Sequence, residues 1–391
     1  MDYVIRVFDN PLELPAQAWD ALSALQDAPS PFMQHAYLAA LHTSGSATPE
    51  TGWTPRFVTL WQANTLVGAC ALYVKDHSYG EYVFDWAWAN AYGEHGLAYY
   101  PKGLVAVPFT PVPGARLLAI DALARQALLE AVLQICQQLK LSSLHLLFTS
   151  PADRQACDAL GLMQRQTVQF HWHNANSQGS PFDSFDTFLA SLSQEKRKKI
   201  KQERRRVADA GVTFRVSEGA AIRTEDWDFF YQCYERTYLE HGNAPYLSRA
   251  FFQSMQDQMP ANWVLFVAER EGRPIASSLI AVQGLGTSEA VAYGRYWGAL
   301  ERVDCLHFEA CYYQPLSWCI ARDVQRFEGG AQGEHKMARA LMPVATYSAH
   351  WLAHPAFADA VERFLERERA GVDHYLDHLA ARSPFKRHEP Q

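Results

Sequence analysis

The pattern of apolar and polar residues predicts the same order of elements in both halves of the chain. In the first half, strands are expected at 56–61, 66–74 and 104–109, with a polar turn between the first two. A helix at 121–139 and a further strand at 143–148 follow. In the second half the order recurs at 263–269, 274–282, 289–297, 306–323 and 324–328. Two similar layouts in one chain indicate a duplicated domain.

A cluster of turn-forming residues at 174–181 marks the expected boundary between the halves. The sequence therefore predicts an N-terminal domain at 1–175 and a C-terminal domain at 176–391. The second domain is expected to include a basic helical segment at about 187–210, either one helix or two with a break, and a helical tail from Pro355 to about Leu379. The fold class is mixed α/β (α+β), each domain having a mixed, mainly antiparallel sheet flanked by helices.

Charge is distributed unevenly along the chain. The net charge is −7, which excludes a protein that binds polyanions over its whole surface. Yet eight of the eleven residues in 196–206 are basic. A charge run is often only a solvated face, but this density favours contact with a phosphate-rich ligand such as tRNA, coenzyme A or a lipid carrier. The candidate anion-binding residues are Lys196, Arg197, Lys198 and Lys199.

The start of the chain and its cysteines point to a reducing compartment. The first residues lack the pattern of a signal peptide, and no apolar stretch approaches the roughly 18 residues of a membrane-spanning helix. Seven cysteines without a C-x-x-C pair indicate neither a disulfide framework nor a zinc site. We therefore expect a cytoplasmic protein without a structural metal. Cys305, Cys311 and Cys319 are interpreted as small buried apolar residues.

Several motifs together resemble a known family. They are SPFMQHAY at 30–37, GEYVFD at 80–85, PK at 101–102, VPFTP at 107–111, YGRYWG at 293–298, HFE at 307–309 and FEGGAQGEHK at 327–336. The set resembles the FemAB-like family, which is placed among GNAT acyltransferases and linked to peptidoglycan biosynthesis. The resemblance implies two tandem GNAT-type domains and transfer of an acyl or aminoacyl group to an amine.

One departure from the GNAT pattern concerns the donor. A GNAT domain that uses coenzyme A holds the pyrophosphate on a glycine-rich loop before its central helix. The corresponding stretch here, 298–307, has no Gly-x-Gly. The Fem enzymes, which the chain resembles, use aminoacyl-tRNA instead. The donor is therefore left as acyl-coenzyme A or aminoacyl-tRNA.

Candidate catalytic residues follow from what acyl transfer requires, a base for the amine and donors for the carbonyl oxygen. His335 lies in a glycine-rich loop that follows a predicted buried strand, where sites of α/β proteins gather. Glycines at 329, 330 and 333 are expected to let the backbone approach a ligand. Glu328 is expected to pair with Arg295, either structurally or catalytically. The candidate catalytic residues are His335, Glu334, Glu328, Arg295, His307 and Glu309.

Candidate substrate-binding residues lie in both halves. Those of the second half are Lys336, Gln332 and Tyr293, and those of an aromatic segment in the first half are Asp85, Trp88, Tyr100 and Lys102. Such aromatic residues also fill cores. Asp304 is the expected N-cap of the central helix, and Glu309 in its first turn also fits a purely dipole-satisfying role.

The leading hypothesis is thus an N-acyl or aminoacyl transferase acting on an amine acceptor, related to cell-wall precursors. Two alternatives remain open: a non-catalytic protein that binds RNA or anionic lipid, and an acetyl-coenzyme A-dependent N-acetyltransferase. The acceptor and the oligomeric state are not indicated by the sequence.

Overall fold

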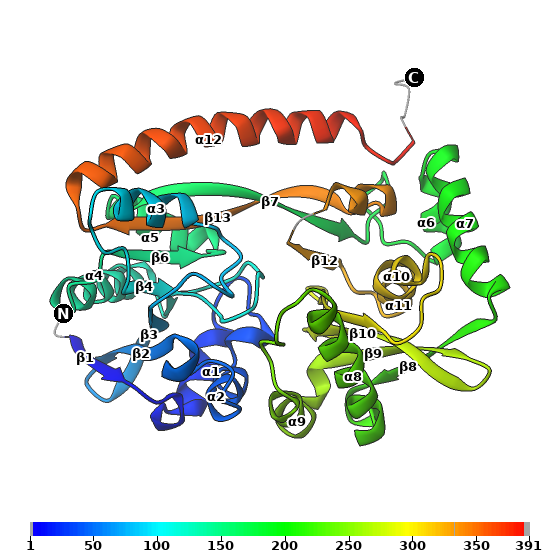
Figure 1. Cartoon of the computed structure of the whole chain (residues 1–391), viewed down its shortest axis with the longest axis horizontal. Helices are drawn as coiled ribbons and strands as arrows, with labels where there is room; N and C mark the ends of the chain where they lie inside the picture. Colours follow the sequence, from blue (N-terminus) through cyan, green and yellow to red (C-terminus); the bar gives the residue numbers. More distant parts are fainter. Residues whose placement is uncertain (1–2, 332, 387–391) are drawn as a thin grey trace. The chain divides into compact units, whose positions relative to one another are not determined.

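The computed structural model describes residues 3–331 and 333–386 of the chain. Its contacts divide the chain into two units (Figure 1). Unit 1 comprises 1–167, 246–251 and 345–375, and unit 2 comprises 168–245, 252–344 and 376–391. This division differs from the predicted one in two ways. The main chain passes between units at 167/168, before the turn-rich segment, and the unit containing the first half also receives two later segments.

The sheet of unit 1 follows the order β1-β2-β3-β4-β6-β13, with β5 beside β3. Its strands are β1 (Tyr3–Phe8), β2 (Trp53–Gln62), β3 (Thr65–Lys75), β4 (Lys102–Val105), β5 (Leu118–Ala119), β6 (Ser143–Leu147) and β13 (Met342–Leu352), the last from 345 onward. A two-residue turn joins β2 and β3 as predicted, with Ala63 at φ 52°. β4 and β6 are parallel, and the other pairs in this path are antiparallel.

Helices cover the sheet of unit 1. They are α1 (Ala16–Ala24), α2 (His35–Thr43), α3 (Trp86–Glu94), α4 (Ala122–Gln138), α5 (Pro151–Ala159) and, through residue 375, α12 (Pro355–Ala381). The predicted helical stripe of α4 is buried in the core, where Leu128 and Val132 pack with Leu144 and Leu146 of β6. Asp121 caps α4 by accepting a hydrogen bond from the backbone N–H of Ala124 at 2.8 Å.

The sheet of unit 2 follows the order β7-β12-β11-β10-β9-β8. Its strands are β7 (Met163–His173, from 168 onward), β8 (Val212–Glu218), β9 (Trp263–Arg270), β10 (Arg273–Gln283), β11 (Val291–Ala299) and β12 (Arg326–Ala331). β11 and β12 are parallel, as β4 and β6 are in unit 1, and the other pairs are antiparallel. The predicted repetition of element order is therefore present.

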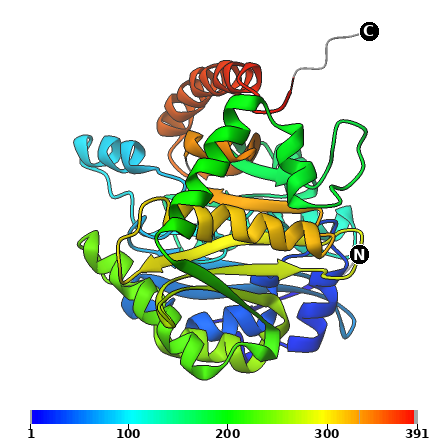
Figure 2. The same ribbon diagram turned by 90° about the vertical axis from the view of Figure 1, so that its right-hand side faces the viewer.

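The helices of unit 2 lie on both faces of its sheet (Figure 2). They are α6 (Phe185–Ser191), α7 (Gln194–Asp209), α8 (Thr224–Glu240), α9 (Arg249–Gln258, from 252 onward), α10 (Leu306–Phe308), α11 (Gln314–Ala321) and the short helix η7 (Glu334–Arg339). A π-helical turn, η6 (Glu309–Tyr313), joins α10 to α11.

The basic region forms two helices, α6 and α7, which is one of the two expected arrangements, and the break lies at Leu192, where the backbone is extended. One detail of the predicted central helix is corrected. The N-cap of the central helix is Cys305, with φ 67°, rather than Asp304. The helical tail is present as α12, but most of it belongs to unit 1. In the described part of the chain, no helix combines the length and apolarity needed to span a membrane.

Candidate functional site

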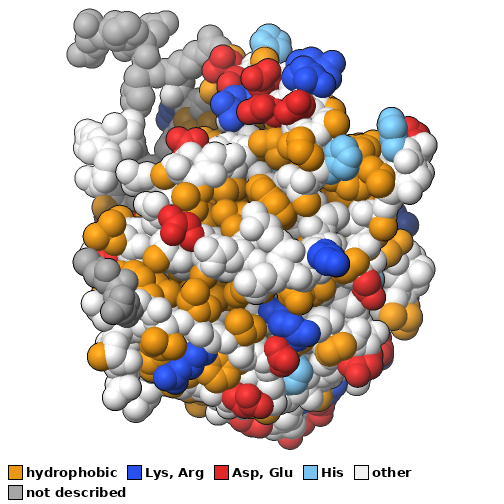
Figure 3. Space-filling view, turned by 90° about the vertical axis from the view of Figure 1, so that its left-hand side faces the viewer, with side chains coloured by type: hydrophobic (Ala, Val, Ile, Leu, Met, Phe, Trp, Pro, Cys, Tyr) orange, Lys and Arg blue, Asp and Glu red, His pale blue; other side chains and the backbone are white. Residues whose placement is uncertain are grey.

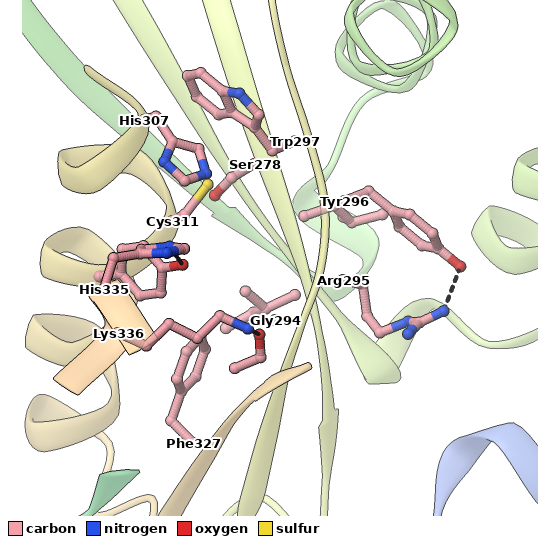
Figure 4. A pocket seen from close by; sticks show the side chains of 14 residues that line it. Ser278, Gly294, Arg295, Tyr296, Trp297, His307, Cys311, Phe327, His335 and Lys336 are labelled. Atoms are coloured by element: carbon pink, nitrogen blue, oxygen red, sulfur yellow. Dashed lines mark hydrogen bonds between the residues drawn. The ribbon is translucent and has the colours of Figure 1, made fainter. Parts of the chain in front are cut away.

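The candidate site lies where two parallel strands of unit 2 separate. β11 and β12 pair only over three positions, Val291–Tyr293 against Arg326–Glu328. Beyond these positions a cavity of about 260 Å³ opens between the strands and the central helix (Figure 4). β10, β11, β12, the helix α10–η6 and η7 each contribute to its wall. The lining residues used below are Ser278, Gly294, Arg295, Trp297, His307, Cys311, Tyr312, Phe327, Gly329, His335 and Lys336.

A β-bulge shapes the β11 wall. The register of β10 against β11 shifts between Leu279 and Ile280, which leaves Arg295 without an opposing residue. The side chains of Arg295 and Tyr296 consequently leave β11 on the same side, away from the histidines (Figure 4). Arg295 donates a hydrogen bond to the Tyr296 hydroxyl at 3.2 Å.

The predicted ion pair between Arg295 and Glu328 is replaced by a local one. Glu328 accepts a hydrogen bond from Arg326 at 2.9 Å, within the same strand. Burial raises the pKa of Glu328 to about 7 although the Arg326 charge opposes the shift. Glu328 does not line the cavity, because successive side chains of a strand point to opposite faces and its neighbours Phe327 and Gly329 face the cavity.

His335 reaches the cavity from the first turn of η7. Its side chain is largely exposed, and its Nε2 lies 3.3 Å from the Tyr312 hydroxyl of the central helix. Partial burial and the charges of Lys336 and Arg339 lower the pKa of His335 below its usual value. The imidazole is therefore neutral at pH 7 and able to accept a proton.

Arg339 connects the His335 turn to α7. Its guanidinium donates to the His335 carbonyl at 2.8 Å and to the Glu203 carboxylate of α7 at 2.9 Å. The same guanidinium lies over the Phe308 ring, 3.6 Å from its centroid. The Tyr313 hydroxyl also donates to Glu203. The turn that carries His335 is thus held by a buried charge pair rather than by solvent-exposed loop contacts.

Lys336 is buried next to His335 and points along the edge of β12 (Figure 4). Its ammonium donates to the carbonyls of Gly329 at 2.6 Å and Gly330 at 3.1 Å. Burial lowers the pKa of Lys336 to about 8. The cavity therefore contains a cation at neutral pH, and this cation can stabilise negative charge.

His307 and Cys311 complete the helix wall. Burial and the nearby charges of His335, Arg339 and Lys336 lower the pKa of His307 to about 4, so its imidazole is neutral at pH 7. Its ring contacts Trp297 edge-on at 5.4 Å between centroids. Burial raises the pKa of Cys311, so the thiol stays protonated and is a poor nucleophile. Cys311 is only partly buried, but its protonated thiol agrees with the interpretation of a small apolar residue and not a nucleophile.

Two glycines of the loop pack closely against the chain. A Cβ atom at Gly329 would lie 2.5 Å from the Leu341 side chain, and one at Gly333 would lie 2.5 Å from the His335 ring. Gly330 adopts φ 74°, which glycine tolerates without strain. Local packing therefore requires glycine at 329 and 333, and Gly329 also lines the cavity.

The other predicted residues of the second half lie outside the cavity. Glu309 is buried and accepts hydrogen bonds from Arg204 of α7 at 3.2 Å and Gln314 at 2.7 Å. Glu334 is half-exposed, 3.5 Å from Arg382. Tyr293 is buried opposite Glu328, and burial raises its pKa. Gln332 lies outside the described residues.

The predicted substrate-binding segment of the first half is mostly an internal polar network of unit 1. The Lys102 ammonium is fully buried and donates to Glu81 at 2.8 Å and to Asp85 at 2.5 Å. Tyr99 donates to Asp85 and contacts His145, whose Nδ1 lies 2.7 Å from Nδ1 of His350.

Two further predicted residues close this network. Tyr100 contacts Ser78, which accepts a hydrogen bond from Lys102, and Trp88 packs its ring against His350. Asp85, Trp88 and Lys102 are each 5% exposed or less. These side chains stabilise unit 1 from within, and the expected ligand-facing surface is corrected accordingly.

The basic helix presents its charge to solvent. Lys198 and Lys199 are exposed, and Lys196 and Arg197 are half-buried. Arg204 is instead engaged by Glu309. On the face shown in Figure 3, Lys and Arg side chains are scattered among acidic and apolar ones. The dense run on α7 is thus a local feature suited to contact with an anion.

Sequence reasoning missed part of the cavity wall. Ser278, Trp297, Tyr312 and Phe327 line it but were not among the candidates. Helical spacing places Tyr312 on the apolar face of the helix expected at 306–323, and spacing alone does not reveal the π-helical turn that carries it. The sequence feature that could have identified Tyr312 as a lining residue is its position one to two helical turns after His307.

Comparisons with known proteins agree with this architecture. The structure of FemX gives a TM-score of 0.55 at 11% identity, covering 93% of this chain and 100% of that one. L-PGS from Bacillus licheniformis gives 0.54 at 11% identity, covering 92% and 99%. The C-terminal domain (DUF2156) of a putative lysylphosphatidylglycerol synthetase from Agrobacterium fabrum gives 0.52 at 12% identity, covering 88% and 93%. At these identities the likeness shows the fold alone.

A search of curated proteins found no significant match. The predicted mixed α/β fold class, with a mixed and mainly antiparallel sheet flanked by helices in each of two units, is confirmed. A family model described as peptidoglycan biosynthesis/recognition matches residues 11–387, almost the whole chain. The chain therefore belongs to the FemAB-like family.

Proposed function

We propose that the protein transfers an acyl or aminoacyl group to an amine acceptor related to peptidoglycan, with the cavity of unit 2 as its active site. The observation that supports this most directly is the pairing of a neutral imidazole, His335, with a buried ammonium, Lys336, in one cavity between separating strands. A base and an oxyanion partner side by side are what amide formation needs. Membership of the FemAB-like family favours the same reaction class.

The reaction proceeds by attack of the acceptor nitrogen on the donor carbonyl carbon. His335 accepts the proton that the nitrogen loses, directly or through water. The new C–N bond forms as the carbonyl oxygen becomes negative, and the bond from the carbonyl carbon to the donor oxygen or sulfur then breaks. The proton held by the imidazole passes to that leaving group, which balances the exchange. Tyr312, whose pKa is raised by burial, stays protonated and orients the imidazole.

Two features of the cavity support stabilisation of the negative oxygen. The Lys336 ammonium supplies a positive charge in a partly desolvated site, where electrostatic interactions are stronger than in water. The bulge at Arg295 interrupts the regular pairing of β10 and β11 at the cavity wall. Bulges occur often next to active sites, where they re-aim a side chain.

The donor that fits the structure better is an aminoacyl ester of tRNA. The segment before the central helix has no Gly-x-Gly, so it does not offer the glycine-rich loop that holds a pyrophosphate in coenzyme A-dependent enzymes. Its glycine, Gly298, has another role, since a Cβ there would lie 1.9 Å from the Cys233 carbonyl of α8. The exposed basic face of α7 offers a place for the tRNA backbone.

A second candidate function is binding of RNA without catalysis. The observation that favours it is the basic run of α7, which is independent of the cavity. The two functions differ in what happens to the donor. A binding protein retains tRNA in a salt-dependent manner and forms no amide, whereas the enzyme forms one.

The test is an assay with purified full-length protein, an amine-bearing peptidoglycan precursor as acceptor, and either aminoacyl-tRNA or acetyl-coenzyme A as donor. Amide product is measured by mass spectrometry. We expect product with aminoacyl-tRNA and a loss of at least about 100-fold in kcat/KM for His335→Ala. The matched control, His374→Ala, removes an exposed histidine of α12 and should leave the rate unchanged. An unchanged rate in His335→Ala would overturn the assignment of the base.

A further inference from the structure

Unit 1 contains a second cavity, built by other residues than those of the candidate active site. It has a volume of about 430 Å³ and is bounded by α5, the first residues of β7, β13 and α12. The lining residues that bear on its chemistry are Arg154, Asp158, Gln164, Arg165, Tyr347 and Arg369. A volume of this size is within the range of small-ligand sites.

Two of the three arginines are already engaged. Arg165 forms a bidentate pair with Glu368, both contacts at 2.8 Å, and donates to the Phe84 carbonyl at 2.7 Å. Arg369 donates to the Gln164 carbonyl at 3.3 Å. These contacts fix the wall of the cavity and leave the third arginine, Arg154, as the group that faces a ligand.

Arg154 is held in place by stacking alone. Its guanidinium lies over the Tyr347 ring, 3.3 Å from the centroid. Among residues 3–331 and 333–386, none accepts a hydrogen bond from this guanidinium or forms an ion pair with it, and its Nε is buried. A stacked guanidinium keeps its in-plane N–H groups free for a planar oxyanion.

The Gln164 side chain provides a second set of polar atoms without partners. Both Oε1 and Nε2 are buried, and within the described chain neither makes a hydrogen bond. A buried polar atom without a partner costs about 1–3 kcal/mol. An amide that lines a cavity with both atoms unsatisfied is complementary to another amide, which offers an N–H and a C=O.

We propose that this cavity binds the carboxylate end of a peptide, with the carboxylate on Arg154 and the adjoining peptide group on Gln164. The charges of the wall favour this choice over phosphate. Three guanidiniums are opposed by Asp158 and by Glu368, which leaves one positive charge for one carboxylate. A phosphate dianion would be under-compensated and has no N–H for Oε1 of Gln164. This site is independent of the proposed transfer reaction.

The test is calorimetric titration of the full-length protein with N-acetyl-alanyl-alanine, with the same dipeptide as its C-terminal amide, and with inorganic phosphate. We expect the free carboxylate to bind at least about 10-fold more tightly than either of the other probes. Arg154→Met and, separately, Gln164→Leu should each weaken this binding by about 10-fold or more. The matched control is Arg6→Met, which removes an arginine that also stacks on an aromatic ring, Trp61 at 4.7 Å.

Three results would overturn the proposal. Equal affinity for the dipeptide and its amide would mean that the carboxylate is not recognised. Phosphate binding as tight as that of the dipeptide would make the cavity a phosphate site. No binding of the dipeptide to the wild-type protein would mean that water alone fills the cavity. Because the comparison of the probes uses the wild-type protein, it holds even if a variant fails to fold.

Discussion

The hydroxyl oxygen of Tyr312 lies 3.3 Å from Nε2 of His335, so the π-helical turn of the central helix and the loop after β12 meet in one cavity. The two residues are 23 positions apart and come from separate elements. Their contact orients an imidazole that is otherwise largely exposed to solvent. Tyr312 therefore positions the proposed base, His335, and does not itself take the proton from the acceptor amine.

Replacing Tyr312 by Phe should lower kcat by about 10-fold and leave KM within twofold of the wild-type value. The reason is that Phe keeps the ring packing but removes the hydrogen bond that orients His335, so the loss falls on the chemical step. Steady-state kinetics of amide formation measure this split. The control is Tyr79→Phe, because Tyr79 is exposed and lies in unit 1. A rise in KM at constant kcat would instead place Tyr312 in substrate binding.

The pH dependence of kcat/KM should show a plateau bounded by two ionisations. The pKa of His335 is lowered below 6.5, so the rate should fall only at more acidic pH, where the imidazole becomes protonated. The pKa of Lys336 is lowered to about 8, so the rate should fall again above about pH 8 as the ammonium loses its charge.

The variant Lys336→Met separates these two limbs. It should abolish the alkaline limb and move the acid limb to higher pH, because a positive charge next to His335 has been removed. Profiles of kcat/KM from pH 4.5 to 9.5 give both values. An acid limb at or above pH 6.5 in the wild-type protein would contradict the role of His335.

Much of the fold could be read from local patterns. The β2–β3 and β9–β10 hairpins and the helix α4 follow from period-two and helical spacing, which depend on neighbours in sequence. His335 and Lys336 were placed in a loop after a buried strand and His307 at the start of the central helix, and all three line one cavity in the structure. That they act in catalysis stays a prediction.

The errors arose where the fold decides a side chain's partner. Lys102 was named as a candidate substrate-binding residue, since nothing in its local sequence shows that Glu81 and Asp85 fold back onto it. Glu328 was paired with Arg295 across the strands, but the bulge turns Arg295 away. Insertions of one residue in a strand or helix change every later orientation, and they leave no clear periodic signal.

Two glycine substitutions should have opposite effects on stability. Gly298→Ala places a Cβ 1.9 Å from the Cys233 carbonyl, so β11 and α8 must separate, and we expect a loss of about 1–3 kcal/mol in unfolding free energy. Gly371→Ala lies in α12, where a Cβ meets no atom within 4 Å, and we expect a gain of up to about 1 kcal/mol. Urea denaturation measures both. A stable Gly298→Ala protein would contradict the close packing of these elements.

Binding of tRNA should depend on salt through α7. Changing Lys196, Arg197, Lys198 and Lys199 to Gln should reduce the slope of log K against log salt by about 3, since each phosphate contact contributes about 0.7–0.9. Fluorescence anisotropy at salt concentrations from about 50 to about 300 mM gives the slope. The double variant Arg236→Gln and Arg273→Gln removes exposed charges elsewhere and serves as the control. An unchanged slope in the α7 variant would exclude this helix as the contact.

Removing the cation from the polar network of unit 1 should destabilise the protein strongly. Lys102→Met leaves Glu81 and Asp85 buried without their ammonium partner, and breaking such a buried pair typically costs about 3–5 kcal/mol. Equilibrium urea denaturation at pH 7 measures the loss. The control Lys201→Met changes an exposed lysine and should stay within about 0.5 kcal/mol of wild type.

The pH dependence of this loss identifies its cause. Burial alone would raise the pKa of Asp85, yet the charges of Lys102 and His145 lower it to about 2. In the wild-type protein its contribution is therefore present above pH 3.8 and is lost as the pH falls toward 2. Without Lys102, burial should raise the pKa of Asp85, so the variant loses less stability at pH 4 than at pH 7. A deficit that is the same at both values would mean that lost packing, rather than uncompensated charge, destabilises the variant.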